Sequence, residues 1–160
     1  MMSVPISVVV NGKAIETTVD ERTLLVTFIR EDLKLTGTHI GCDTAQCGAC
    51  SIHLNGAVVK ACSMLALQAQ GGMITTIEGI AESDTQLHPM QHAFSENHAL
   101  QCGFCTPGMV MTALDIIKEY PAPTREIVQE GLDGNLCRCT GYNGIIDAVI
   151  AGAKAMNARK

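Results

Sequence analysis

The chain has 160 residues, of which 47% are hydrophobic, and a formal net charge of −5 at pH 7. This length and apolar content suffice for one domain, or two small ones, whose core needs no disulfide bridges. The acidic balance and scattered basic residues argue against binding to nucleic acid, and no run of about 18 apolar residues predicts a transmembrane helix.

Residues 1–78 predict mostly β structure around one helix. Two Asn-Gly pairs, Asn11-Gly12 and Asn55-Gly56, favour the type I′ turns of two-residue hairpins. Between these hairpins, Thr23–Glu31 has apolar residues at the spacing of an amphipathic helix. The expected strands are Val8–Val10, Ala14–Val19, Ser51–Leu54, Ala57–Lys60 and Ile74–Ile77.

Residues 79–85 are small and polar, which is typical of a linker, and helical periodicity dominates residues 86–160. Thr106 is predicted to be the N-cap of the longest helix and Pro107 its first residue. The four expected helices are His88–His98, one from Thr106 to before Pro121, one from Thr124 to Leu132, and one through Ile145–Ala153. The sequence therefore predicts an α+β fold with a small helical bundle at its C-terminal end.

Eight cysteines form two groups of four along the chain. The first group has the spacing C-x4-C-x2-C-x11-C, and the second combines C-x2-C with C-x-C. Four thiolates are the ligand set of one [2Fe–2S] cluster, and C-x4-C-x2-C followed by a distant cysteine is the plant-type ferredoxin spacing. The predicted ligands are Cys42, Cys47, Cys50 and Cys62 for one cluster, and Cys102, Cys105, Cys137 and Cys139 for the other.

The residues next to the cysteines suit a buried anionic cluster. Such a cluster carries a charge of about −2 when oxidised, and its burial costs free energy unless fixed dipoles face it. Backbone N–H groups provide these dipoles, and glycines let a loop turn its amides inward. Glycines stand in or beside both cysteine groups, at Gly41, Gly48, Gly103, Gly134 and Gly141.

The cysteines could also serve purposes other than iron–sulfur binding. Zinc is the main alternative, since paired short knuckles are typical of zinc sites, but the first group crowds three cysteines on one loop. A disulfide framework needs an oxidising compartment and a higher cysteine density. The residues alone leave three hypotheses: an electron-transfer subunit, a free two-cluster ferredoxin, and a zinc-stabilised interaction module.

Four segments together resemble a known family: GCDTAQCGAC, KAC, LQCGFCTPGM and GNLCRCTGYNGI. They are similar to the iron–sulfur subunit of the molybdenum hydroxylases, the xanthine dehydrogenase and aldehyde oxidoreductase superfamily, and most of all to the small subunits of bacterial carbon monoxide dehydrogenases. The resemblance implies a β-grasp, ferredoxin-like domain over residues 1–78 that binds the outer cluster. It also implies a four-helix-bundle-like domain over residues 86–160 that binds the inner cluster.

The resemblance also implies cofactors and partners outside this chain. A large subunit would hold a molybdopterin, of the cytosine dinucleotide type, in contact with Gln101 and Cys139. A medium subunit would bind FAD, so that electrons pass from molybdenum through the inner and outer clusters to FAD or another acceptor. The assembly would be a dimer of heterotrimers that oxidises an aldehyde, an N-heterocycle or carbon monoxide, and this chain alone would turn over no substrate.

The start of the sequence has no basic segment and no small-residue cleavage site of a signal peptide. Eight cysteines without such a signal point to a reducing compartment. The expected location is therefore the cytoplasm. Attachment to the inner membrane, or export with a signal-bearing partner, stays open.

Overall fold

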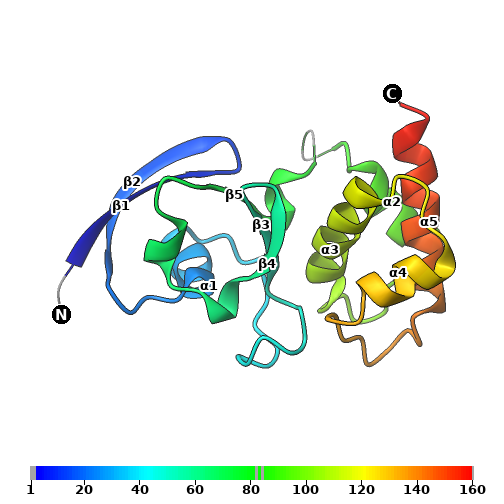
Figure 1. Cartoon of the computed structure of the whole chain (residues 1–160), viewed down its shortest axis with the longest axis horizontal. Coiled ribbons are helices and arrows are strands. Elements are labelled where there is room, and N and C mark those ends of the chain that lie inside the picture. The colour runs from blue at the N-terminus through cyan, green and yellow to red at the C-terminus, as the bar shows by residue number, and fades with distance from the viewer. Residues whose placement is uncertain (1–2, 82, 84, 160) are drawn as a thin grey trace.

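In the computed structural model, which describes residues 3–81, 83 and 85–159, the strands lie at one end of the molecule and the four longer helices at the other (Figure 1). The strands are β1 (Ser3–Val10), β2 (Lys13–Asp20), β3 (Ser51–Leu54), β4 (Ala57–Lys60) and β5 (Met73–Thr75). They form one sheet in the order β2-β1-β5-β3-β4. Because β1 and β5 are parallel and the other neighbours antiparallel, the sheet is mixed.

Both predicted hairpins are confirmed, and both turn at an Asn-Gly pair. Asn11 and Gly12 have φ values of 49° and 77°, and Asn55 and Gly56 have 53° and 80°. Two consecutive positive φ values are the requirement of a type I′ turn, which Asn and Gly meet with the least strain. The first hairpin is longer than predicted, with β1 and β2 paired over their full lengths.

The last strand is shorter than the predicted Ile74–Ile77. Thr76 leaves the sheet because its backbone N–H donates to Asn11 Oδ1 at 2.9 Å instead of to a neighbouring strand. Ile77 then begins the short 3₁₀ helix η4 (Ile77–Gly79). Two similar short helices, η2 (Ala61–Ser63) and η3 (Ala66–Ala69), connect β4 to β5.

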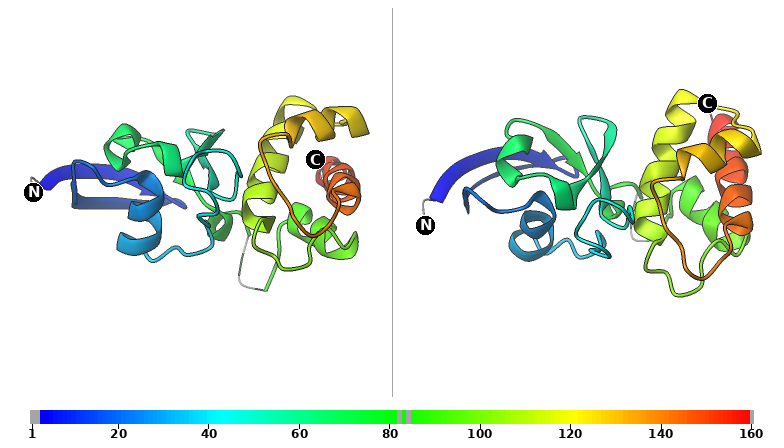
Figure 2. Two further views of the ribbon diagram at one scale, coloured as in Figure 1. Left: turned by 90° about the horizontal axis from the view of Figure 1, so that it is seen from below. Right: turned by 60° about the horizontal axis from the view of Figure 1, so that its bottom comes forward.

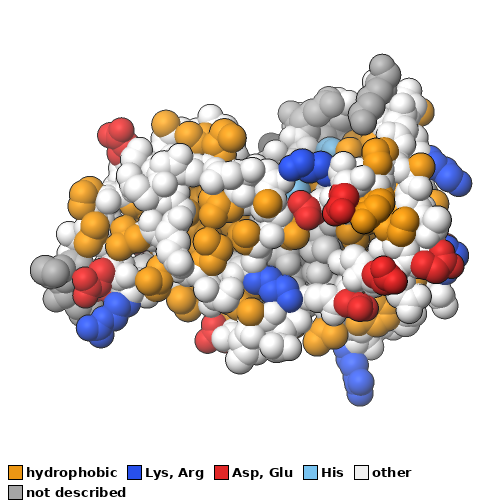
Figure 3. Space-filling view, in the orientation of Figure 1, with side chains coloured by type: hydrophobic (Ala, Val, Ile, Leu, Met, Phe, Trp, Pro, Cys, Tyr) orange, Lys and Arg blue, Asp and Glu red, His pale blue; other side chains and the backbone are white. Residues whose placement is uncertain are grey.

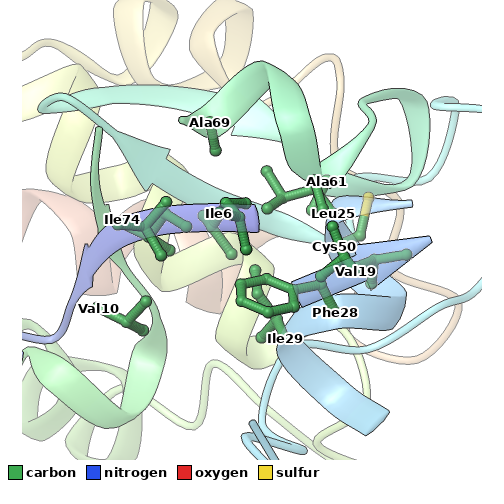
Figure 4. Close-up of a cluster of buried hydrophobic side chains, with 14 of the residues drawn as sticks. Ile6, Val10, Val19, Leu25, Phe28, Ile29, Cys50, Ala61, Ala69 and Ile74 are labelled. Atoms are coloured by element: carbon green, nitrogen blue, oxygen red, sulfur yellow. The ribbon is translucent and has the colours of Figure 1, made fainter. Parts of the chain in front are cut away.

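The predicted helix at Thr23–Glu31 starts later and changes its winding. It consists of α1 (Leu25–Thr27) and a π-helical turn, η1 (Phe28–Asp32), in which the Leu33 N–H donates to the Phe28 carbonyl five residues earlier. Its apolar side chains are fully buried against the sheet, and Figure 4 shows Phe28 and Ile29 among the strand residues of this core.

The C-terminal helices are α2 (Pro89–Glu96), α3 (Thr106–Glu119), α4 (Arg125–Gly131) and α5 (Asn143–Asn157). They pack around a second core that includes Met90, Phe94 and Met109. Helix α3 lies between the sheet and the other helices, where it contacts β3 and β4 (Figures 1 and 2). The two cysteine-bearing regions therefore belong to two cores joined through α3.

The structure corrects one predicted helix cap and confirms another. Thr106 is the first residue of α3 and not its N-cap, and Pro107 is the second, because Cys105 already has helical torsion angles and accepts the Met109 N–H at its carbonyl. The buried Thr106 hydroxyl has no hydrogen-bond partner among the described residues. Thr124 does cap α4, since its hydroxyl accepts the Ile127 N–H at 3.4 Å.

The expected linker, residues 79–85, is described only in part, and residues 82 and 84 lie outside the described residues. Within that segment Gly79 belongs to η4, and Ser83 forms an isolated bridge with Gln86. Among the described residues, no helix is both long enough and apolar enough to cross a membrane. On the face shown in Figure 3, Lys and Arg side chains are dispersed among acidic and apolar ones.

Candidate metal centres

The first cysteine group is assembled by the loop before β3 and the β3–β4 hairpin. Cys50 directly precedes β3, and Cys62 lies in η2 directly after β4, so the pairing of Ser51 with Lys60 brings the two cysteines together. The Cys50 thiol lies close enough to those of Cys62 and Cys47 to interact electrostatically with both. Cys42 joins them because its Sγ accepts the Cys47 N–H at 3.3 Å. All four predicted ligands of this group are thus neighbours.

Two kinds of sulfur environment occur in this group. The hydroxyl and N–H of Thr44, together with the Cys47 N–H, lower the pKa of Cys42 to about 6. Burial has the opposite effect on Cys50, whose pKa it raises to about 12. A buried thiolate is stable only with a compensating positive charge, and a metal that displaces the proton supplies one. The donor set therefore fits a cationic iron centre.

The backbone of the first loop is wound tightly around the Cys42 sulfur. Three of its residues have positive φ: Asp43 at 57°, Ala45 at 58° and Gly48 at 71°. For the non-glycine residues this conformation is uncommon and costs about 1 kcal/mol each. It turns successive N–H groups to one side, as in the backbone nests that bind anions. In this strained loop the N–H groups of Thr44 and Cys47 both point to the Cys42 sulfur.

The second cysteine group is assembled from two loops of the helical part, one between α2 and α3 and one between α4 and α5. Cys102 and Cys105 precede α3, whereas Cys137 and Cys139 lie between α4 and α5. The sulfurs of Cys139 and Cys102 are 3.6 Å apart, and the Cys105 thiol interacts with that of Cys137. The structure thus brings together all four predicted ligands of the second group.

The sulfurs of this group also differ in burial and in hydrogen bonding. Burial raises the pKa of Cys105 to about 12. Burial also opposes ionisation of Cys137, but the hydroxyl and N–H of Thr140, at 3.2 and 3.4 Å from its sulfur, lower the pKa overall. A hydrogen bond with Cys102 raises the pKa of the exposed Cys139 thiol. The second donor set therefore also fits a group that replaces these protons with metal charge.

Among the described residues, no set of three or more His, Cys, Asp or Glu side chains is arranged to hold a single metal ion. A [2Fe–2S] cluster distributes its four thiolates over two irons, with sulfide between them, so its ligands are not gathered around one centre. Two separate quartets of neighbouring thiols fit that donor arrangement.

Gln101 and Cys139, the two residues expected to contact a pterin, lie side by side. The Gln101 side-chain N–H donates to the Cys139 carbonyl at 3.1 Å, although 38 residues separate them in the sequence. Both residues are exposed, as is Cys102. This edge of the second cysteine group is therefore open to a partner.

The two cysteine regions touch through their backbones, which the sequence did not reveal. The Leu136 N–H donates to the Cys47 carbonyl at 2.9 Å. Beside it, the buried Asn135 donates from Nδ2 to the Gly48 carbonyl at 3.2 Å and accepts at Oδ1 from the Thr112 hydroxyl at 3.0 Å. These bonds join the first cysteine loop to the segment before Cys137.

A second contact between the regions uses aromatic rings. The His39 imidazole stacks on Phe104 with ring centroids 4.6 Å apart and an interplanar angle of 17°. Its Nδ1 also lies 2.7 Å from the Phe104 carbonyl oxygen. Phe104 stands between Cys102 and Cys105, and His39 precedes the first cysteine loop. The stack therefore holds the Cys102–Cys105 loop against the segment that leads into the first cysteine loop. Nothing local in the sequence indicated that His39 would reach this loop.

Comparison with known proteins agrees with this arrangement. Residues 8–73 match the model of a "2Fe-2S iron-sulfur cluster binding domain", and residues 76–150 match that of a "[2Fe-2S] binding domain". The chain is 50% identical over 152 residues to the caffeine dehydrogenase subunit gamma of Pseudomonas sp. (strain CBB1), covering 93% of this chain and 90% of that one.

The chain belongs to the iron–sulfur small subunits of the molybdenum hydroxylases. The nicotine 6-hydroxylase small subunit of Paenarthrobacter nicotinovorans is 49% identical to this small subunit over 147 residues, with 92% of this chain and 88% of that one covered. The crystal structure of quinoline 2-oxidoreductase from Pseudomonas putida 86 superposes with a TM-score of 0.93, at 46% identity, and covers 98% of this chain and 97% of that chain. The small subunit thus has two [2Fe–2S]-binding domains and is the electron-transfer component of an oxidoreductase complex.

Proposed function

We propose that the two cysteine quartets each hold one [2Fe–2S] cluster and that electrons pass between them within this chain. Each cluster supplies reversible one-electron chemistry when it is bound. The observation that carries the proposal is the assembly of both quartets on loops that hydrogen-bond to each other, from the Leu136 N–H to the Cys47 carbonyl. The proposed ligands are Cys42, Cys47, Cys50 and Cys62 for the outer cluster, and Cys102, Cys105, Cys137 and Cys139 for the inner cluster.

The chain's own contribution is to hold these sulfurs and to control their surroundings. The N–H groups of Thr44 and Cys47 stabilise negative charge on Cys42, and Thr140 does the same for Cys137. Burial of Cys50 and Cys62 excludes water from one side of the first quartet. We assign these tasks to a β-grasp domain over residues 1–78 and a four-helix-bundle-like domain over residues 86–160, and the two cores support this division.

We place the large molybdopterin subunit against the exposed edge of the second quartet. Gln101 and Cys139 are exposed together there and are the proposed pterin contacts, with the cytosine dinucleotide form as the proposed cofactor. Exposed apolar side chains stand beside the same cysteines in sequence: Leu100 (39%), Phe104 (46%) and Leu136 (56%). Apolar side chains around a polar centre are typical of a surface that a partner covers.

The other end of the electron route is proposed to be a medium subunit that binds FAD, in a dimer of heterotrimers. Relatives of this chain are named for caffeine, nicotine and quinoline. All three compounds are N-heterocycles, which supports that substrate class over carbon monoxide. Because the thiols must stay reduced to bind iron, we place the complex in a reducing compartment such as the cytoplasm.

The test is anaerobic purification of the chain with its natural partners. We expect two distinct [2Fe–2S] signals in electron paramagnetic resonance after reduction, iron and acid-labile sulfide in equal amounts, and a co-purifying large chain that contains molybdenum. A colourless protein with stoichiometric zinc and no iron would contradict the proposal. Recovery of this chain alone, with both clusters bound, would support cluster binding and would refute the proposed complex.

A further inference from the structure

Lys60 places a positive charge between the two cysteine regions. It is the last residue of β4, and its Nζ donates to the Ala45 carbonyl at 2.7 Å. Ala45 lies on the first cysteine loop, between Cys42 and Cys47. The same ammonium also lies against Gly134, three residues before Cys137, since a Cβ added to Gly134 would be 3.1 Å from Nζ.

This charge is not neutralised within the described part of the chain. The ion pair found there joins Arg125 to Asp147, and no carboxylate pairs with Lys60. The side chain is half-buried, so solvent screens its field less than it screens a fully exposed charge. Lys60 is therefore an unpaired cation held where the two cysteine loops approach each other.

We propose that Lys60 is a countercharge shared by both clusters, and that it raises the reduction potential of each. This inference rests on the proposed function. Each cluster takes up one electron on reduction, supplied in the complex by the molybdenum centre, and gains one negative charge. A fixed positive charge near both centres stabilises the reduced form of each and weakens the repulsion between two reduced clusters.

Lys118 provides a matched control for this role. Its Nζ also donates to a backbone carbonyl across the junction of the two parts, that of Gly56, at 2.8 Å. Gly56 lies at the tip of the β3–β4 hairpin, on the opposite end of the strands from Cys50 and Cys62. Lys118 therefore shares the charge and the type of hydrogen bond of Lys60, but not its position between the cysteine loops.

The experiment is a redox titration of the anaerobically purified complex, monitored by electron paramagnetic resonance, which reports the two clusters separately. Lys60→Gln removes the charge and keeps an N–H donor. At a fixed applied potential we expect the ratio of reduced to oxidised cluster to fall on the order of tenfold for both clusters. Lys60→Arg and Lys118→Gln should leave both ratios within about twofold of the wild type.

A second pair of variants decides the matter if Lys60→Gln does not take up iron. Gly134→Asp places a carboxylate beside Lys60, whereas Gly134→Asn has the same shape without the charge. We expect both clusters to be harder to reduce in Gly134→Asp than in Gly134→Asn. Equal potentials in this pair, or in Lys60→Gln and wild type, would overturn the inference, as would a shift of one cluster alone.

The inference and the proposed function fail in different ways. If the wild-type complex lacks two [2Fe–2S] signals, the proposed function is wrong, and the inference falls with it. If both signals are present and the Lys60→Gln potentials match the wild type, only the inference is wrong.

Discussion

Asn135 shows how one buried side chain can connect distant parts of this molecule. It is 4% exposed, and both ends of its amide are used, Oδ1 by Thr112 of α3 and Nδ2 by Gly48 of the first cysteine loop. Buried polar groups are stable only when they are hydrogen-bonded in this way. The position of Cys137, two residues later, is thereby tied to the first cysteine group.

Asn135→Ala should destabilise the chain through both partners. The Thr112 hydroxyl and the Gly48 carbonyl would lose a hydrogen bond in a buried setting, so we expect the free energy of unfolding to fall by about 1–3 kcal/mol. Anaerobic chemical denaturation followed by circular dichroism measures it. Thr112→Ser keeps the hydroxyl and should cost less than Asn135→Ala. Equal stability of Asn135→Ala and wild type would show that this bridge contributes nothing.

Gln101→Ala should leave both clusters in place but slow the reduction of the inner one by substrate. If Gln101 donates a hydrogen bond to the pterin, its loss is worth up to about tenfold in that rate. Stopped-flow absorbance of the complex measures cluster reduction. Gln46 is a matched control, because it too is exposed, precedes a cysteine and donates to a backbone carbonyl, that of Thr44. A rate that is equally slow in Gln46→Ala would contradict a specific role for Gln101.

At this scale the sequence predicts ligands better than it predicts their environment. Cysteine spacing indicated both quartets because cluster binding restricts the separation of ligands along a loop. The contacts of Asn135, Lys60 and His39 were not predictable, since each reaches a segment distant in sequence or opposite in the fold. A Gly-Asn pair or a strand-end lysine is common in proteins and carries no local sign of such a contact.

Among the helices and strands, the features that depend only on residues close in sequence were predictable. The two hairpins follow from Asn-Gly pairs, which meet the turn's backbone requirement within two residues. The shortened β5 follows instead from the hydrogen bond between Asn11 and Thr76, and Phe28 and Ile29 of the π-helical turn η1 are buried in the first core. These features depend on tertiary partners, so residue patterns alone did not reveal them.

Gly108 allows α3 to approach the first cysteine loop, so Gly108→Ala should be harmful. A Cβ there would lie 2.2 Å from the Gly48 carbonyl oxygen, which is backbone and cannot rotate away. At Gly152 of α5 the nearest atom is the side-chain sulfur of Met90, 2.6 Å away, and the Met90 Cα lies at 3.3 Å. We expect Gly108→Ala to lower the free energy of unfolding by about 1–3 kcal/mol. Gly152→Ala should cost less, because better helix propensity, worth about 1 kcal/mol, offsets part of the shift of Met90.

Thermal denaturation of the two cluster-loaded variants under anaerobic conditions compares these costs directly. The proposed arrangement also requires Gly108→Ala to disturb the outer-cluster signal more than Gly152→Ala does, since only Gly108 faces the first cysteine loop. Equal stability and equal signals in the two variants would contradict the close approach of α3.

Over the whole molecule, the chain forms two cores from separate stretches of sequence. Residues of the first core lie between Ile6 and Ile74, and those of the second between Met90 and Ala153. Such a division follows from the change of periodicity along the sequence. The junction of the cores does not, because Gly48 and Asn135 meet across 87 residues through a backbone carbonyl, which leaves no trace in residue patterns.

Because the two cores are formed from separate stretches of sequence, each cluster should be lost without the other. Cys47→Ser removes a ligand of the first quartet but leaves the Cys47 carbonyl available to the Leu136 N–H. Cys105→Ser removes a ligand of the second quartet and leaves the first quartet intact. Each variant should therefore lose about half of the bound iron and keep one of the two signals in electron paramagnetic resonance. Iron analysis of both variants, purified in parallel with the wild type, provides the comparison. If either substitution removes both signals, the halves depend on each other's clusters for folding, and the contacts through Leu136 and Asn135 are then too strong for the two cores to be independent units.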